Sequence, residues 1–295
     1  MNKNRLLYLV TTAVLAAIVV VLQIVGGIPV GPFSITLTLF PIVVGAVVLG
    51  PVPGLILGLV FGVVVSILSI TGKDPGGQMV FAANPVMAWI SCLAKGALAG
   101  VIPGVAYSFF SKHKNASAAV SYLSAGAFIF LGGIGCASGL SGQRTGVQIG
   151  LSMLFALVAG GLLVGLHFLL KAERAPLYIA SVLAPVCNTF TFVVFMMIFF
   201  RPVLQAWAGG SDVLVYTITG LVGINFLIEF SVAIILTPAL AAIAHYAKKH
   251  IIRKPAANDT RKPKAIKPVN SILAWVILAL VLAAAVIIAL IVIKA

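Results

Sequence analysis

The sequence predicts an all-α integral membrane protein with about nine transmembrane spans. Of its 295 residues, 62% are hydrophobic and only 8% are charged, and the mean hydropathy is +1.22. A water-soluble domain needs roughly a quarter of its residues charged to cover its surface, so lipid must cover most of this one. Apolar stretches of about 20 residues, the length that crosses the hydrocarbon as a helix, recur along the chain.

Charges, Pro/Gly clusters and polar runs divide the chain into nine candidate spans. They cover residues 5–25, 35–49, 52–70, 85–110, 117–140, 147–170, 176–200, 213–246 and 271–293. The second is short and the eighth is long for a single crossing. The first starts with basic residues, as a signal peptide does. Because its long apolar run leads straight into further spans, we expect a retained helix.

The basic residues predict the orientation of these spans. With the N-terminus in the cytoplasm, 14 of the 19 Lys and Arg lie inside: Lys3, Arg5, Lys112, Lys114, Lys171, Arg174, Lys248, Lys249, Arg253, Lys254, Arg261, Lys262, Lys264 and Lys267. The outside holds Lys73, Arg144, Arg201 and Lys294. This asymmetry follows the positive-inside rule, and it accounts for the net charge of +14 without a nucleic-acid partner. Nine spans place the C-terminus outside.

Small residues recur at helical spacing in three spans. Two glycine seams are formed by Gly50, Gly54, Gly58 and Gly62, and by Gly96, Gly100 and Gly104. Such seams let helices approach closely in lipid, and we expect both to pack internally. Ala13 and Ala17 make a shorter pair in the first span, which suits either internal packing or a partner subunit.

Three spans carry polar residues near the middle of the membrane. Lys95, Asn188 and Asn225 each lie ten to twelve residues into a span, about 15–18 Å deep at 1.5 Å per residue. Glu229 lies one turn from Asn225 on the same helix face. Intramembrane charges are costly and usually mark a site. Two interpretations stay open: a structural ion pair between Lys95 and Glu229, or a polar pocket in which Lys95 meets an anionic ligand.

Further polar and aromatic residues lie nearer the outer face. Gln23, Thr38, Asn84 and Trp89 are candidates for lining such a pocket, although Trp89 also fits the interfacial aromatic belt. Residues 26–36 are too apolar and proline-rich for an ordinary exposed loop, and we expect them to fold over the pocket as a lid.

Known signatures of catalysis are missing from the sequence. It contains no Walker-type glycine loop, HExxH motif or nucleophile elbow, and no paired intramembrane carboxylates. The three cysteines form no CxxC pair, and the four histidines form no cluster, so no metal or cofactor is expected. The sequence therefore predicts ligand binding without enzymatic activity and without an internal energy source. An autonomous secondary carrier for a small organic anion and a non-transport membrane scaffold are the alternatives.

Four blocks of the chain resemble a known family. They are GPFSITLTLFPIVVGAVVLGPVPGLILGLVFGVV (31–64), NPVMAWISCLAKGALAGVIPG (84–104), LAPVCNTFTFVVFMMIFF (183–200) and GINFLIEFSVAIILTPAL (223–240). Together with the AxxxA pair Ala13/Ala17, they are similar to the S components of energy-coupling factor (ECF) vitamin transporters. The pantothenate-type branch is the most similar.

The resemblance implies a six-helix protein of the prokaryotic cytoplasmic membrane that binds a vitamin near the outer side. Its first-helix AxxxA face would contact a transmembrane coupling subunit that carries two ATPases. The family core would be residues 1–110 and 176–250. Residues 111–175 would be an inserted transmembrane hairpin, 251–270 a basic cytoplasmic linker and 271–295 an extra transmembrane helix.

Pantothenate carries one carboxylate, hydroxyls and an amide, and the ammonium of Lys95 is a chemically reasonable partner for its carboxylate or for that of another small anionic vitamin. The amides of Asn84, Asn188 and Asn225 would match the hydroxyl and amide groups of pantothenate. Gln23, Thr38 and Trp89 complete the expected set.

Overall fold

The computed structural model describes residues 3–25, 28–30, 33–35, 37–113, 175–210 and 212–217, with isolated positions at 120 and between 229 and 246. All of these belong to one compact unit, Met1–Ile252. The predicted spans 117–140 (apart from residue 120), 147–170 and 271–293 lie outside the described residues, as do the basic linker and Asn225.

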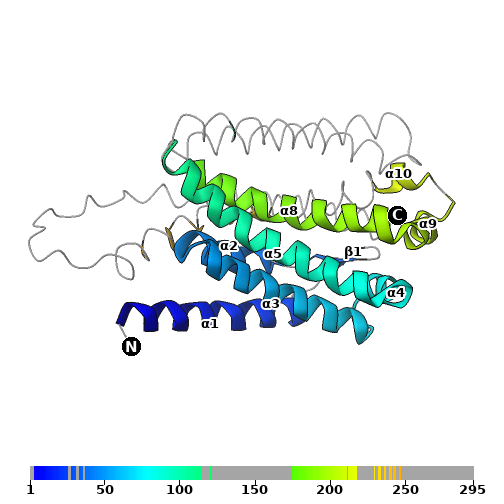
Figure 1. Cartoon of the computed structure of the whole chain (residues 1–295), viewed down its shortest axis with the longest axis horizontal. Coiled ribbons are helices and arrows are strands. Elements are labelled where there is room, and N and C mark those ends of the chain that lie inside the picture. The colour runs from blue at the N-terminus through cyan, green and yellow to red at the C-terminus, as the bar shows by residue number, and fades with distance from the viewer. Residues whose placement is uncertain are drawn as a thin grey trace, which may run out of the picture. The chain divides into compact units, whose positions relative to one another are not determined.

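Four of the described helices are long and apolar enough to cross a membrane: α1 (Lys3–Val25), α3 (Pro51–Ile70), α5 (Pro85–Phe110) and α8 (Ala175–Phe199). Their ends agree with the predicted spans to within two residues. The helices lie side by side, with α3 packed between α1 and α5, and α5 packed between α3 and α8 (Figure 1). The chain is therefore a helical membrane protein, as predicted.

The predicted span at 35–49 is shorter than expected. Helix α2 covers only Leu39–Val48, about 15 Å of rise, which is half of the roughly 30 Å hydrocarbon core. The residues before it form an antiparallel hairpin of β1 (Ile28–Val30) and β2 (Phe33–Ile35), in which Ile28 pairs with Ile35. The segment expected to be an irregular lid is thus partly a hairpin, and the described chain is not purely α-helical. Pro29 cannot donate a backbone hydrogen bond, and it is tolerated here because each strand of a two-stranded hairpin is an edge strand.

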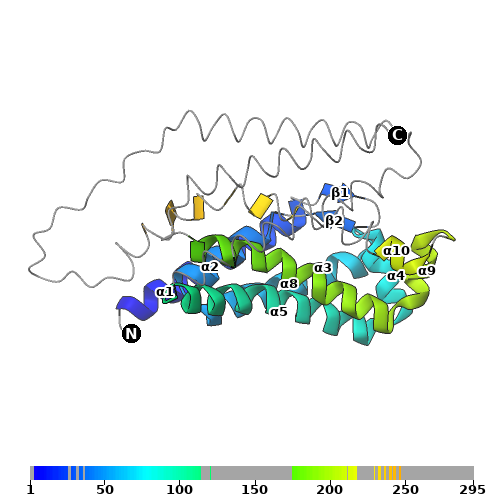
Figure 2. The same ribbon diagram turned by 90° about the horizontal axis from the view of Figure 1, so that it is seen from above.

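Helix α2 is buried on nearly every side because it packs against α1, α3, α5 and α8 (Figure 2). Its side chains belong to two apolar clusters. One includes Ile42 and extends to α1, α3, α5, α8 and the short helix α9 (Arg201–Ala208). The other joins α2 to the first turns of α8. A helix too short to span the bilayer is thus stabilised by its neighbours.

Three short helices gather at one end of the bundle, which we call the α4 end (Figures 1 and 2); the sequence predicted only the third of them, as the start of the span at 213–246. They are α4 (Pro75–Ala83), α9 and α10 (Val213–Tyr216). The indole Nε1 of Trp207 on α9 donates a hydrogen bond to the sulfur of Met79 on α4, at 3.2 Å. The connection from α3 to α4 turns at Gly72, whose φ of 76° is readily adopted only by glycine.

The two glycine seams face each other across α3 and α5. Gly54 lies against Gly100, Gly58 against Gly96, and Gly62 against Cys92, so closely that a Cβ atom on any of these glycines would collide with the opposite backbone. The prediction that both seams pack internally is confirmed at these positions. The close approach fixes how α3 and α5 are placed relative to each other, and both helices carry residues of the candidate site.

Candidate binding site

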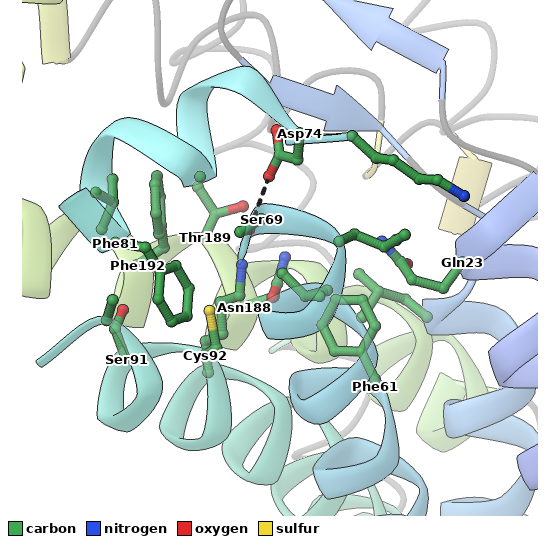
Figure 3. Close-up of a pocket in the computed structure, with 18 of the residues that line it drawn as sticks. Gln23, Phe61, Ser69, Asp74, Phe81, Ser91, Cys92, Asn188, Thr189 and Phe192 are labelled. Carbon is green, nitrogen blue, oxygen red and sulfur yellow. Dashed lines mark hydrogen bonds between the residues drawn. The ribbon is translucent and has the colours of Figure 1, made fainter. Parts of the chain in front are cut away.

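A cavity of about 180 Å³ opens among the helices near the α4 end (Figure 3). Its wall combines aromatic and aliphatic side chains with an unusual number of polar ones. The polar lining residues are Gln23, Ser69, Lys73, Asp74, Ser91, Lys95, Asn188, Thr189 and Glu229. A cavity of about 150 Å³ accommodates benzene, so this one has room for a small organic molecule.

Lys95 lies on α5 and lines this cavity. Its Nζ is 5.0 Å from the ring centroid of Phe192 on α8 and 5.9 Å from that of Phe61 on α3. At such distances the negative faces of the rings attract the ammonium group. The ammonium of Lys95 thus lies at the cavity wall, near one ring from α3 and one from α8. This position agrees with the interpretation in which Lys95 faces a polar pocket.

Asn188, Thr189 and Glu229 form a polar group on the same cavity. The hydroxyl of Thr189 donates to Oε2 of Glu229 at 3.3 Å. Asn188 is only 8% exposed, and its Oδ1 accepts no hydrogen bond. Lys95 and Glu229 attract each other across the cavity, but no direct ion pair between them is among the contacts of the described chain. The predicted ion pair therefore stays a prediction.

Gln23 lines the cavity from α1, and Thr38 holds it there. The hydroxyl of Thr38 donates to Oε1 of Gln23 at 2.9 Å, and both side chains are buried. Thr38 itself is not part of the cavity wall. Of the two predicted residues, Gln23 thus faces the cavity, and Thr38 orients the side chain of Gln23.

We expect Thr38→Val to destabilise the protein by about 1 kcal/mol, because the buried Gln23 oxygen loses its donor while side-chain volume is almost unchanged. Thermal unfolding in detergent measures this effect. Thr71→Val is the matched control, since the Thr71 hydroxyl bonds only to backbone carbonyls at an exposed helix end. Equal unfolding temperatures for the two variants would contradict the expectation.

Two predicted residues support the site without lining it. Asn84 is the N-cap of α5: its Oδ1 accepts a hydrogen bond from the backbone N–H of Met87 at 3.1 Å. The sequence carried this signal, because an Asn followed by Pro is typical of a helix start. Trp89 packs edge-on against Phe81, with ring centroids 6.0 Å apart, and it is Phe81 that faces the cavity.

Sequence reasoning missed several lining residues, among them Phe61, Ser69, Asp74, Ser91, Thr189 and Phe192. Helical spacing from Lys95 would have found some of them. Ala88, Ser91 and Cys92 lie seven, four and three positions before it, so they share its face of α5. On α8, Phe192 lies one turn after Asn188 in the same way.

Ala13 and Ala17 are both exposed on α1, away from the cavity. Large apolar side chains on the same helix, including Val10, Val14 and Ile18, are exposed too. This face is therefore open to lipid or to another subunit, and the predicted contact with a coupling subunit stays a prediction.

Comparison with known proteins identifies no relative: no family model matches this chain, and no curated protein matches it. Evidence about the function therefore comes from the cavity and from the residues that line it.

Proposed function

We propose that this chain is the substrate-binding membrane subunit, or S component, of an ECF-type uptake transporter, and that it binds pantothenate. The observation that carries the proposal is the position of Lys95. Its ammonium lies on the wall of a small cavity between membrane-spanning helices, among buried amide and hydroxyl groups. A charge inside the membrane is costly, and such residues commonly mark a substrate pathway.

The chemistry of the cavity supports a small anionic ligand with further polar groups. The ammonium of Lys95 pairs well with a carboxylate. Gln23, Asn188 and Ser91 offer amide and hydroxyl groups that match the amide and hydroxyls of pantothenate. The volume of about 180 Å³ lies below the roughly 300–1,000 Å³ typical of pockets for drug-sized ligands, which disfavours a large fused-ring vitamin such as riboflavin.

In this proposal, partners supply the energy for transport. The sequence has no nucleotide-binding loop, and a transmembrane coupling subunit with two ATPases would take that role in the cytoplasmic membrane of a prokaryote. The N-terminus lies in the cytoplasm. The exposed face of α1 around Ala13 and Ala17 is available for contact with the coupling subunit.

The proposal is tested by thermal unfolding of the detergent-purified protein with a panel of vitamins and without ATP. Pantothenate at 100 times its dissociation constant should stabilise the protein by about 2.7 kcal/mol, whereas riboflavin, biotin and thiamine should leave it unchanged. Stabilisation by another vitamin would retain the transporter class and replace the ligand. No stabilisation by any vitamin would contradict the proposal.

Liposome uptake separates the proposal from an autonomous secondary carrier. The chain alone should bind pantothenate without transporting it, and addition of the coupling subunit and ATPases should start uptake. Uptake by the chain alone that collapses with the ion gradient would favour the carrier instead.

A further inference from the structure

Within the part of the chain that the structure describes, two cavity side chains carry buried oxygens without a hydrogen-bond donor: Oδ1 of Asp74 and Oδ1 of Asn188. A buried acceptor left without a donor loses the hydrogen bonds that water would give it, so proteins rarely keep one without a reason. Both oxygens belong to residues that face the same space, and a ligand in that space is the natural source of donors.

Asp74 stands at a position where an aspartate normally has another role. It is the N-cap residue of α4, with extended backbone angles (φ −121°, ψ 96°), yet its side chain does not cap the helix. One carboxylate oxygen instead accepts a hydrogen bond from Ser69 on α3 at 3.3 Å (Figure 3). The carboxylate therefore does not accept hydrogen bonds from the backbone N–H groups of the first helical turn, which an N-cap aspartate usually does.

Gly77 makes this arrangement possible. It lies one turn into α4, and a Cβ atom there would collide with the Ser69 hydroxyl and come within 2.6 Å of Oδ2 of Asp74. Any larger residue would push Ser69 and Asp74 from their present positions. The absence of a side chain at Gly77 thus leaves room for Asp74 beside Ser69 at the cavity.

Asp74 and Lys95 mark different levels of the cavity. The Lys95 ammonium lies near the ring of Phe61, whereas Asp74 accepts a hydrogen bond from Ser69; the backbones of these two α3 residues are eight residues, or about 12 Å, apart along the helix axis. Asn188 is closer to the Lys95 level, because it lies one turn before Phe192, the other ring that contacts the ammonium.

We infer that the ligand is bipolar: its anionic group binds Lys95, and a hydroxyl or ammonium group at its opposite end donates hydrogen bonds to Asp74. Asn188 accepts from a donor nearer the anionic end. This inference rests on the proposed function and extends it, since it names the donor end of the ligand and a recognition residue, Asp74. Pantothenate meets the requirement with its hydroxyls, and an amino analogue meets it with an ammonium.

Three compounds test the inference by titration against the purified protein. They are pantothenate, a dideoxy analogue with both hydroxyls replaced by hydrogen, and an amino analogue with the terminal hydroxyl replaced by an ammonium. We expect the dideoxy analogue to bind about tenfold more weakly than pantothenate, because Asp74 then stays without a donor. The amino analogue should bind at least as tightly as pantothenate, because its ammonium can make a charge-assisted hydrogen bond to the Asp74 carboxylate. Binding no tighter than that of the dideoxy analogue would overturn the inference.

Asp74→Asn should weaken pantothenate binding about tenfold and leave binding of the dideoxy analogue unchanged, because the new amide can retain the Ser69 bond but turns a donor toward the cavity. Asp212→Asn is the matched control. Its carboxylate accepts from the backbone of Leu214 and is not part of the cavity wall, so both affinities should stay at the wild-type values. Equal losses for both compounds in Asp74→Asn, or no loss at all, would overturn the inference.

Ligand-free protein provides an independent measurement. If Asp74 serves a ligand, Asp74→Asn should unfold at the wild-type temperature or above it, whereas loss of the real helix cap in Asn84→Ala should lower the temperature by a few degrees. A decrease in Asp74→Asn as large as that in Asn84→Ala would make Asp74 structural and overturn the inference. Failure of all three compounds to bind would contradict the proposed function, and this measurement would still decide the role of Asp74.

Discussion

Replacing Lys95 by methionine is expected to weaken pantothenate binding at least about thirtyfold. Removal of one partner from a buried, hydrogen-bonded charge pair costs about 2–5 kcal/mol, and methionine supplies the apolar length of lysine without its charge. The side chain would still pack between Phe61 and Phe192. Titration of purified protein with pantothenate measures the loss directly.

Lys112→Met is the matched control for this substitution. Lys112 is exposed just after the end of α5, so the same change removes a charge without reaching the cavity, and binding should be unaffected. Wild-type affinity in Lys95→Met would mean that the ligand is not anchored by the ammonium, and it would contradict this part of the proposal.

A double-substitution cycle distinguishes ligand binding from the structural role that the sequence left open. If Lys95 mainly compensates Glu229, Lys95→Met should destabilise ligand-free protein, and adding Glu229→Gln should restore most of that stability. If the two charges act separately, the two effects on the free energy of unfolding should add. Because both side chains line a cavity between membrane-spanning helices, where water screens charges less than at an exposed surface, we expect a coupling energy of more than about 1 kcal/mol.

The spanning helices could be predicted from the sequence because lipid imposes a single requirement on them. A stretch such as 85–110 must be mostly apolar for about 20 residues or more, and its ends are set by Pro85 and by the polar residues after Phe110. Hydropathy carries no such information about the α4 end. Helices α4 and α9 have only nine and eight residues, too few for hydropathy to mark them, and they meet through Trp207 and Met79, which are distant in sequence.

The site was predictable only where a polar residue interrupts an apolar span. Lys95, Asn188 and Glu229 were found in this way, and all three line the cavity. Asp74 lies at the end of a helix, where an acidic residue is ordinary, so nothing in the sequence distinguished it. Asn84 illustrates the reverse error: it was predicted to line the site, but its side chain caps helix α5 instead.

Gly58→Ala is expected to destabilise the protein by about 1–3 kcal/mol, because overpacking of a close contact forces the backbone to move. A Cβ atom at Gly58 would collide with the backbone carbonyl of Gly96, which is a rigid group and cannot rotate away. Thermal unfolding in detergent measures the loss. Val63→Leu is the control, since it adds volume to the exposed side of the same helix and should change stability by less than about 0.5 kcal/mol.

The same substitution should also weaken ligand binding, although Gly58 is not part of the cavity wall. Lys95 immediately precedes Gly96, so separating α3 from α5 moves the ammonium away from Phe61 on the opposite helix. Gly96→Ala would place a Cβ atom against the backbone of Gly58, in the same helix contact. The double variant should therefore lose less free energy of unfolding than the sum of the two single losses. Strict additivity, or unfolding of Gly58→Ala at the wild-type temperature, would show that the two glycines do not meet.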